Sequence, residues 1–413
     1  MTQIFRHALS NGLVLVAEPM DWLESVACTL LLPAGSVHDP EDRSGLAGFT
    51  CEMALRGAGE RDSRRIIEDL DNLGVERGES VGDAFTSYSG AMLAGNFPAA
   101  LGIVVDTVRR PHLPEEQLEA SRLGLFQEIQ AVEDEPADRV MIELKRRHYP
   151  FPWGRPSHGD EPSVEATTLD DIRGFFQRHY RPNGGVLAVA GKIDWDRLKD
   201  LAEELLGDWP RGPEPAVAER SRQGGYVHLP AETNQTHIGI AYPTIPFGHE
   251  KYYESAAAVG VLSGGMSSRL FTEVRERRGL CYAVHAGYST LPHLAAVVCY
   301  AGTSAERAQE TLDVTIAELQ RLARGIEPAE LERLKARIRS NLVMQQESSF
   351  GRSGSMAREW ALTGRVQTLE EIEARVARLS CEGINAYLAE RPPRDFAVVT
   401  LGPKPLEVPG GIR

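Results

Sequence analysis

The chain has 413 residues, 42% hydrophobic and 25% charged, which is typical of a globular protein with room for roughly two or three domains. Its 59 acidic and 45 basic residues give a formal net charge of −14, which argues against a nucleic-acid-binding protein. No apolar run approaches the ~20 residues of a membrane-spanning helix. The start of the chain lacks the apolar core of a signal peptide, and the five cysteines show no C-x-x-C spacing. We therefore expect no membrane span, no zinc knuckle, no disulfide framework and a cytoplasmic location.

The first half of the chain predicts runs of strands and runs of helices. Strands are predicted at 12–18, 24–33 and 185–191, and helices at about 43–57, 62–73, 97–109, 114–133, 167–180 and 194–206. The acidic residues 133–135 predict the end of a helix, followed by a turn at Pro136. The stretch 207–224 is rich in proline, glycine and charge, which predicts a linker.

After the linker, strands and helices recur in a similar order. Strands are predicted at 225–229, 234–243, 282–290, 294–302 and 396–401, and helices at about 250–263, 268–278, 303–326 and 328–349. This order favours an α+β fold, with helices covering a largely antiparallel sheet. We predict two homologous domains of about 200 residues each, 1–206 and 225–413, joined by the linker 207–224. The alternative is one such domain beside an unrelated one.

The predicted helix within 44–54 has two distinct faces. At about 100° per residue, Leu46, Phe49 and Met53 form an apolar stripe. Another face carries Gly48, Cys51 and Glu52. The stripe predicts packing against a core, and the second face would be available for another role.

The sequence Gly45-Leu46-Ala47-Gly48-Phe49 resembles the pitrilysin/insulinase family of inverted zinc metallopeptidases. The motif of that family is H-x-x-E-H within G-L-A-H-F-L-E-H-M, where the histidines bind zinc and the glutamate activates water. Residue by residue, Gly48 stands at the first histidine, Cys51 at the glutamate and Glu52 at the second histidine. All three working residues are replaced, so the resemblance implies a degenerate zinc site and no catalytic residue in this chain.

The third zinc ligand of the family is a glutamate further along the chain, and the same separation places Glu128 there. Ser121 stands where the family often has a second acidic residue. Glu128 is thus a residual ligand position, and it could equally be a solvated helix residue. An atypical metal site of Cys51, Glu52 and Glu128 is a further alternative. No two of the eleven histidines are close enough in sequence to chelate a metal from one helical turn.

The second half resembles the family closely. Residues 262–282 resemble the family's stretch G-G-G-M-S-S-R-L-F…R-E-K-R-G-L-A-Y. Residues 178–183 resemble the segment that ends the first half of the chain in that family. In active members, an arginine and a tyrosine seven residues apart hold the substrate backbone or the developing oxyanion. Arg275 and Tyr282 have this spacing. Without the resemblance, they would be interpreted as a surface arginine and a strand tyrosine whose ring packs.

The resemblance implies a non-catalytic subunit of a zinc peptidase heterodimer, as in the mitochondrial processing peptidase. Such a chain would form part of the wall of the substrate chamber and would contain no cofactor. Its Arg275 and Tyr282 would bind unfolded or extended peptides. The zinc would be in a related, zinc-bearing partner subunit. The alternatives are a structural protein, like the peptidase-like core subunits of respiratory complexes, and a weak peptidase with the atypical metal site. Whether the assembly is a homodimer or a heterodimer stays open.

Overall fold

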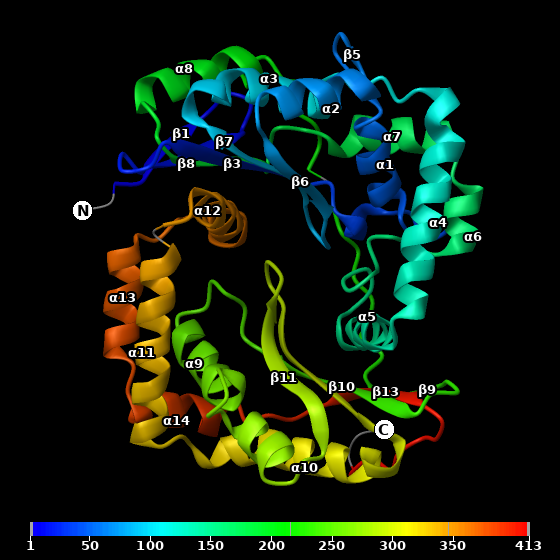
Figure 1. Cartoon of the computed structure of the whole chain (residues 1–413), viewed down its shortest axis with the longest axis vertical. Coiled ribbons are helices and arrows are strands. Elements are labelled where there is room, and N and C mark those ends of the chain that lie inside the picture. Colours follow the sequence, from blue (N-terminus) through cyan, green and yellow to red (C-terminus); the bar gives the residue numbers. More distant parts are fainter. Residues whose placement is uncertain (1–2, 215, 346, 411–413) are drawn as a thin grey trace. The chain divides into compact units, whose positions relative to one another are not determined.

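The computed structural model of the chain describes residues 3–214, 216–345 and 347–410 (Figure 1). It contains two compact units. Unit 1 consists of the described residues of Met1–Gln130, Arg155–Ala218 and Val343–Glu370, and unit 2 of those of Ala131–Gly154, Glu219–Leu342 and Glu371–Arg413. Each unit combines helices with a largely antiparallel sheet, which confirms the predicted α+β class.

Unit 1 is built on a six-stranded sheet. In spatial order its strands are β1 (Phe5–Ala8), β2 (Val14–Pro19), β8 (Val186–Gly191), β3 (Ser25–Leu32), β7 (Thr86–Leu93) and β6 (Glu76–Val81). Only the pairing of β2 with β8 is parallel among these neighbours. A small hairpin of β4 (Gly57–Ala58) and β5 (Arg61–Asp62) lies apart from this sheet.

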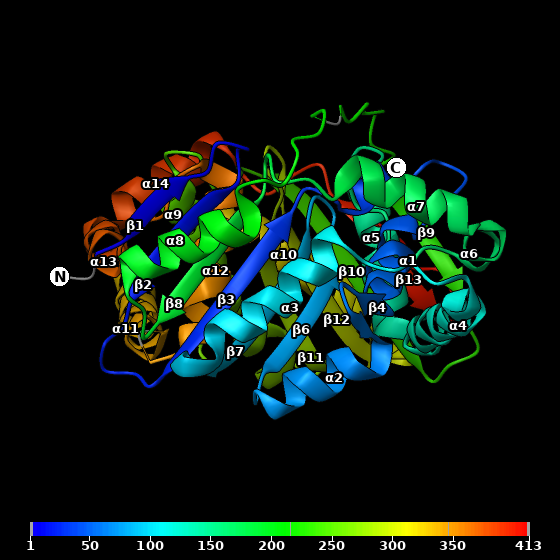
Figure 2. The ribbon, with the colours of Figure 1, turned by 90° about the horizontal axis from the view of Figure 1, so that it is seen from above.

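Helices cover both faces of this sheet. The helices from the first half of the chain are α1 (Leu46–Ala54), α2 (Ser63–Asn72), α3 (Phe97–Arg109), α4 (Leu118–Asp134), α6 (Glu161–Ala166), α7 (Leu169–His179) and α8 (Trp195–Leu206). Helices α3 and α8 lie side by side over one face (Figure 2). Helix α12 (Ser349–Thr363) packs on the other face, against β3 and β8. Every residue of β8 is buried because both of its faces are covered.

The contact between α12 and the sheet of unit 1 is unusually polar. Arg352 Nε donates to Glu18 Oε2 at 2.6 Å, and these side chains are 3% and 1% exposed. The hydroxyls of Ser353 and Thr29 are hydrogen-bonded at 3.0 Å. The apolar part of the contact includes Met356, which is fully buried. Because a buried charge is costly without its partner, this ion pair fixes where α12 lies on the sheet.

Unit 2 is built on a five-stranded sheet. In spatial order its strands are β11 (Cys281–Thr290), β12 (Ala295–Ser304), β10 (Gln235–Thr244), β13 (Ala397–Gly402) and β9 (Gly225–Pro230), and only β13 and β9 pair in parallel. Its other helices are α9 (Tyr252–Ser263), a π-helix (Phe271–Glu276), α10 (Ala308–Arg321), α14 (Cys381–Glu390) and most of α11 (Pro328–Gln345) and α13 (Leu369–Arg378).

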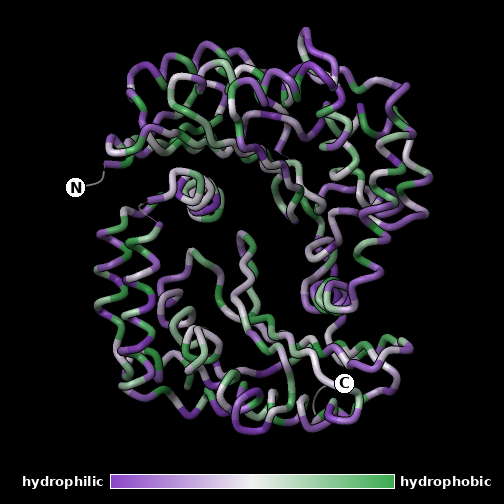
Figure 3. The backbone as a smooth tube through the Cα atoms, viewed as in Figure 1, coloured by the Kyte–Doolittle hydropathy of each residue, from purple (hydrophilic) through white to green (hydrophobic). Residues whose placement is uncertain are grey.

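Helix α5 (Pro136–His148) covers a face of the sheet of unit 2. Val140 and Leu144 of α5 pack directly on Gly239 of β10, where an added Cβ would meet Val140 Cγ1 at 2.7 Å. Glycine at this position therefore lets the helix approach the sheet closely. In Figure 3 the helices alternate between hydrophilic and hydrophobic residues along their length, as amphipathic helices do.

The compact units differ from the predicted continuous halves 1–206 and 225–413 in two places. Helix α5 belongs to unit 2 although it lies in the first half of the chain, and α12 belongs to unit 1 although it lies in the second. The predicted turn at Pro136 is wrong, because α5 begins at that residue. No helix among the described residues combines the length and apolar character needed to cross a membrane.

We predict that the buried ion pair is important for the stability of unit 1. Arg352→Ala should lower the free energy of unfolding by about 3–5 kcal/mol, because it leaves the Glu18 carboxylate buried and unpaired. The double variant Glu18→Gln/Arg352→Met should lose clearly less, and Arg64→Ala, in the exposed pair Arg64–Glu68, less than about 1 kcal/mol. Urea unfolding of the full chain measures all three. Equal losses for Arg352→Ala and Arg64→Ala would contradict the prediction.

Candidate functional site

Helix α1, where the zinc motif would lie, is held at its start by a buried carboxylate. Asp39 accepts hydrogen bonds from the backbone N–H groups of Gly45 and Ala47, both at 2.8 Å. Burial raises the pKa of Asp39 to about 7, although these hydrogen bonds and the charge of Arg155 act in the opposite direction. The predicted apolar stripe of Leu46, Phe49 and Met53 is fully buried in the core. Both contacts fix the face that carries Gly48, Cys51 and Glu52.

The backbone of a neighbouring loop lies against Gly48. A Cβ added at Gly48 would be 2.6 Å from the carbonyl oxygen of Ser157. The same loop contacts the start of α1 through Gly159, where φ is +75° and an added Cβ would be 2.1 Å from the oxygen of Ser44. A larger side chain at position 48 therefore requires the backbone at Ser157 to move. The first ligand position therefore has no histidine, and the Ser157 carbonyl occupies the space that a histidine side chain would need.

Cys51 lies in a buried cluster with two tyrosines. Tyr88 of β7 and Tyr180, next to α7, are hydrogen-bonded through their hydroxyls at 3.0 Å, and both interact with Cys51. Burial raises the pKa of the Cys51 thiol to about 12, and raises the pKa values of both tyrosines well above their usual range. The thiol is therefore neutral near pH 7. It can neither serve as the general base nor readily bind a metal as thiolate.

Glu52, at the second ligand position, forms an ion pair with Arg56 one turn later on the chain. Arg56 Nε also donates to the hydroxyl of Ser121 on α4, at 3.1 Å. Partial burial, followed by the negative charge of Glu52, raises the pKa of Glu128 on the same helix. The fold thus brings the positions of Glu52, Ser121 and Glu128 together. A guanidinium group, rather than a metal ion, balances the charge of Glu52.

This set of side chains does not fit a zinc ion. Gly48 offers no ligand atom, the Cys51 thiol is neutral and Glu52 is bound to Arg56. Across the described ranges, no three His, Cys, Asp or Glu residues are arranged to hold a metal ion. Arg56 was missed by the sequence analysis, although its spacing of four residues from Glu52 on a predicted helix is a recognisable sign of an ion pair.

The residues predicted to handle substrate lie together in unit 2. The guanidinium carbon of Arg275, on the π-helix, is 4.9 Å from the ring centroids of both Phe271 and Tyr282. Within the described part of the chain, Arg275 forms no ion pair with a carboxylate. The guanidinium is thus oriented by two aromatic rings while its charge is left unbalanced.

Tyr282 is 85% exposed because β11 is irregular at its start. Cys281 pairs with Thr303 and Ala283 with Gly302, so Tyr282 is an extra residue in the strand, a β-bulge. A bulge redirects the side chain at that point and is frequent beside functional sites. The ring of Tyr282 is therefore not packed in the core, which was the alternative interpretation from the sequence.

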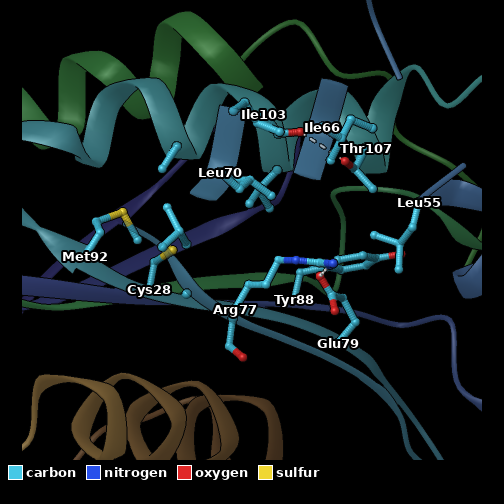
Figure 4. Close-up of a pocket in the computed structure, with 15 residues that line it drawn as sticks. Cys28, Leu55, Ile66, Leu70, Arg77, Glu79, Tyr88, Met92, Ile103 and Thr107 are labelled. Atoms are coloured by element: carbon cyan, nitrogen blue, oxygen red, sulfur yellow. Dashed lines mark hydrogen bonds and ion pairs between the residues drawn. The ribbon is translucent and has the colours of Figure 1, made fainter. Parts of the chain in front are cut away.

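Unit 1 contains a small cavity between its sheet and helices α2 and α3 (Figure 4). Its volume is about 20 Å³, enough for roughly one water molecule. Its walls are mostly apolar, and the ion pair of Arg77 and Glu79, at 2.8 Å, lies at one side. It is too small to receive a peptide side chain.

Comparison with known proteins assigns both halves of the chain to one peptidase family. Residues 16–156 match the description "Insulinase (Peptidase family M16)", and residues 166–338 match "Peptidase M16 inactive domain". An uncharacterized zinc protease of Bacillus subtilis, YmxG, is 28% identical over 405 residues, covering 97% of this chain and 98% of the relative.

Solved structures show the same fold. A crystal structure of a peptidase M16 inactive domain from Pseudomonas fluorescens superposes with a TM-score of 0.90 at 21% identity, covering 98% of this chain and 100% of the other. A protease from Helicobacter pylori gives a TM-score of 0.89 at 19% identity, with the same coverage.

We predict that the space at Gly48 is closed to any side chain. Gly48→Ala should destabilise the protein by about 1–3 kcal/mol, because the added methyl group meets the Ser157 carbonyl. The matched control is Gly102→Ala in α3, where an added Cβ has no neighbour within 4 Å. That variant should gain about 0.5–1 kcal/mol from helix propensity. Chemical unfolding of both variants gives the comparison, and a gain in both would show that the loop does not close the site.

We also predict acid lability from a buried histidine. His179 stacks on His38 with ring centroids 4.7 Å apart, and burial, with the charges of His38 and Arg178, lowers its pKa to about 3. In the unfolded chain the imidazole of His179 is protonated below about pH 6.5, whereas in the folded state it stays neutral until about pH 3. The free energy of unfolding therefore decreases as the pH falls from about 6.5 toward 3. Between pH 7.5 and 5, this histidine should cost about 1–2 kcal/mol. His179→Phe should reduce that loss in unfolding measured at both pH values; an unchanged pH dependence would contradict the assignment.

Proposed function

The chain belongs to the insulinase family of zinc peptidases, peptidase family M16, and we propose that it is the non-catalytic subunit of a two-chain zinc peptidase. The observation that carries this proposal is the contrast between the two halves. The zinc-binding face of α1 is replaced and closed, whereas the half-buried Arg275 remains beside Tyr282, which is exposed on unit 2.

In this proposal, the zinc ion and the residues that activate water are in a related partner subunit. This chain supplies a wall of the substrate chamber and two hydrogen-bond donors. The guanidinium of Arg275 can donate to a peptide carbonyl oxygen, and the hydroxyl of Tyr282 can donate to the same backbone or to an oxyanion forming on it. Both donors act on the main chain, so the substrate class that fits them is an unfolded or extended peptide.

Two physical features support this use of Arg275. Its charge is not balanced by a carboxylate within the described residues, so a substrate oxygen would not have to displace an existing partner. The rings of Phe271 and Tyr282 hold its side chain, which reduces the conformational entropy lost when it binds substrate. We further propose that the assembly works in the cytoplasm, where the five free cysteines of this chain would stay reduced.

The test is reconstitution with a related chain that keeps H-x-x-E-H. The purified subunit should contain far less than one zinc per chain and cleave no unfolded peptide. Mixed with the zinc-bearing chain, it should form a complex that cleaves the peptide faster than that chain alone.

Within that complex, Arg275→Ala should lower the rate by about 10- to 100-fold, the size of effect expected for losing a donor to an oxyanion. Arg324→Ala, an exposed arginine elsewhere in unit 2, is the matched control and should leave the rate unchanged. A mixture no faster than the partner alone, or equal rates for the two variants, would reject the shared site.

A further inference from the structure

A groove of about 570 Å³ lies on unit 1, between the ends of α3 and α8. Three loops meet there and are fixed by backbone hydrogen bonds. Ala94 N donates to Glu24 O at 3.1 Å, Lys192 N donates to Ser25 O at 2.9 Å, and Met20 N donates to Gly191 O at 2.7 Å. We call this the α3–α8 groove. Its walls are held by the sheet, so it is a preformed feature of unit 1.

The floor of the α3–α8 groove is apolar. Its hydrophobic lining residues are Ala94, Phe97, Ile193, Leu198 and Leu201. Leu93, which precedes the groove residue Ala94, is 63% exposed, and Trp22, in the loop that bonds to Ala94 and Lys192, is 62% exposed. Large apolar side chains exposed beside an apolar groove are typical of a binding surface for another protein.

The charges around the groove indicate the sign of its partner. Lys192 is already paired with Glu24, at 2.6 Å, and Asp194 caps α8 by accepting from the backbone N–H of Arg197. Arg197 also lines the groove, so one cation and the two carboxylates of Asp200 and Glu204 remain, a net negative charge. Asp200 and Glu204, both exposed, are one turn apart on α8 and flank Leu201. Neither has an ion pair among the described residues. Two like charges at this spacing repel each other, so a cationic partner would relieve that repulsion.

We propose that the α3–α8 groove docks an amphipathic, cationic helix from a partner protein. Apolar side chains of that helix enter the groove between α3 and α8, and lysine or arginine residues one turn apart pair with Asp200 and Glu204. A helix fits this surface because residues three and four apart share one face, which matches both the apolar floor and the spacing of the carboxylates. An anionic lipid surface does not fit, because the same carboxylates would repel it.

The proposal is tested on the full chain with an 18-residue helical peptide of leucine and lysine, labelled for fluorescence anisotropy. We expect saturable binding that weakens as salt rises. Asp200→Lys/Glu204→Lys should weaken binding about tenfold or more, because two attractive contacts become repulsive. Leu93→Ser should also weaken it. The matched control is Glu116→Lys, an exposed charge reversal elsewhere on unit 1, which should leave the affinity unchanged.

The specificity of binding is tested with three further probes. A scrambled peptide of the same composition and a leucine–glutamate peptide should bind at least tenfold more weakly. Vesicles of anionic or zwitterionic lipid should not bind. The charge-reversed double variant should instead gain affinity for the leucine–glutamate peptide. Equal binding of the scrambled peptide, equal affinity of the double variant and the Glu116→Lys control, or vesicle binding that Leu93→Ser abolishes would each overturn the proposal. None of these measurements depends on peptidase activity.

Discussion

Each sheet of this protein needs helices on both of its faces, and the helix that supplies the second cover comes from the other half of the chain. Unit 1 depends on α12, which is held by the buried ion pair of Arg352 and Glu18. Unit 2 depends on α5, which packs on Gly239. Because each sheet is completed by a segment distant in sequence, neither half of the chain contains all the contacts of its own core. The folded state therefore depends on long-range contacts. Forming them costs conformational entropy, because long loops must close to bring the distant segments together.

The degeneration of the zinc site extends beyond the residues that would bind the metal. The backbone at Ser157 lies where a side chain at Gly48 would begin, Cys51 is buried with tyrosines, and Arg56 neutralises Glu52. These contacts form a consistent, satisfied structure in place of a metal centre. In contrast, the stacked pair of Arg275 and Tyr282 keeps a cation and a hydroxyl at the surface. The difference between the closed α1 face and the accessible pair of Arg275 and Tyr282 is the physical basis for the proposed non-catalytic role.

Some elements were predicted from their hydrophobic pattern, and others were missed: β6, β7, α5, α12, α13 and α14 are among them. For β6 and α12 the reason is a weak pattern. Strand β8 is an unbroken apolar run, and it was predicted within one residue. Strand β6 lies at the edge of its sheet and carries alternating charge in Glu76, Arg77 and Glu79, so no apolar alternation indicates it. Helix α12 is rich in glycine and serine, because part of its contact with the sheet is made of hydrogen bonds. Periodicity measures apolar burial and therefore does not detect contacts of this kind.

The sequence by itself determined the replaced residues of the zinc motif, the α+β class and the spacing of Arg275 and Tyr282, because motifs and periodicity are local properties of the chain. The tertiary structure alone decided which helix covers which sheet, that Ser157 closes the space at Gly48, and that a bulge turns Tyr282 outward. Those features depend on segments that are far apart in sequence and meet only after folding. Local sequence patterns carry little information about such contacts, since many distant segments could satisfy the same apolar face.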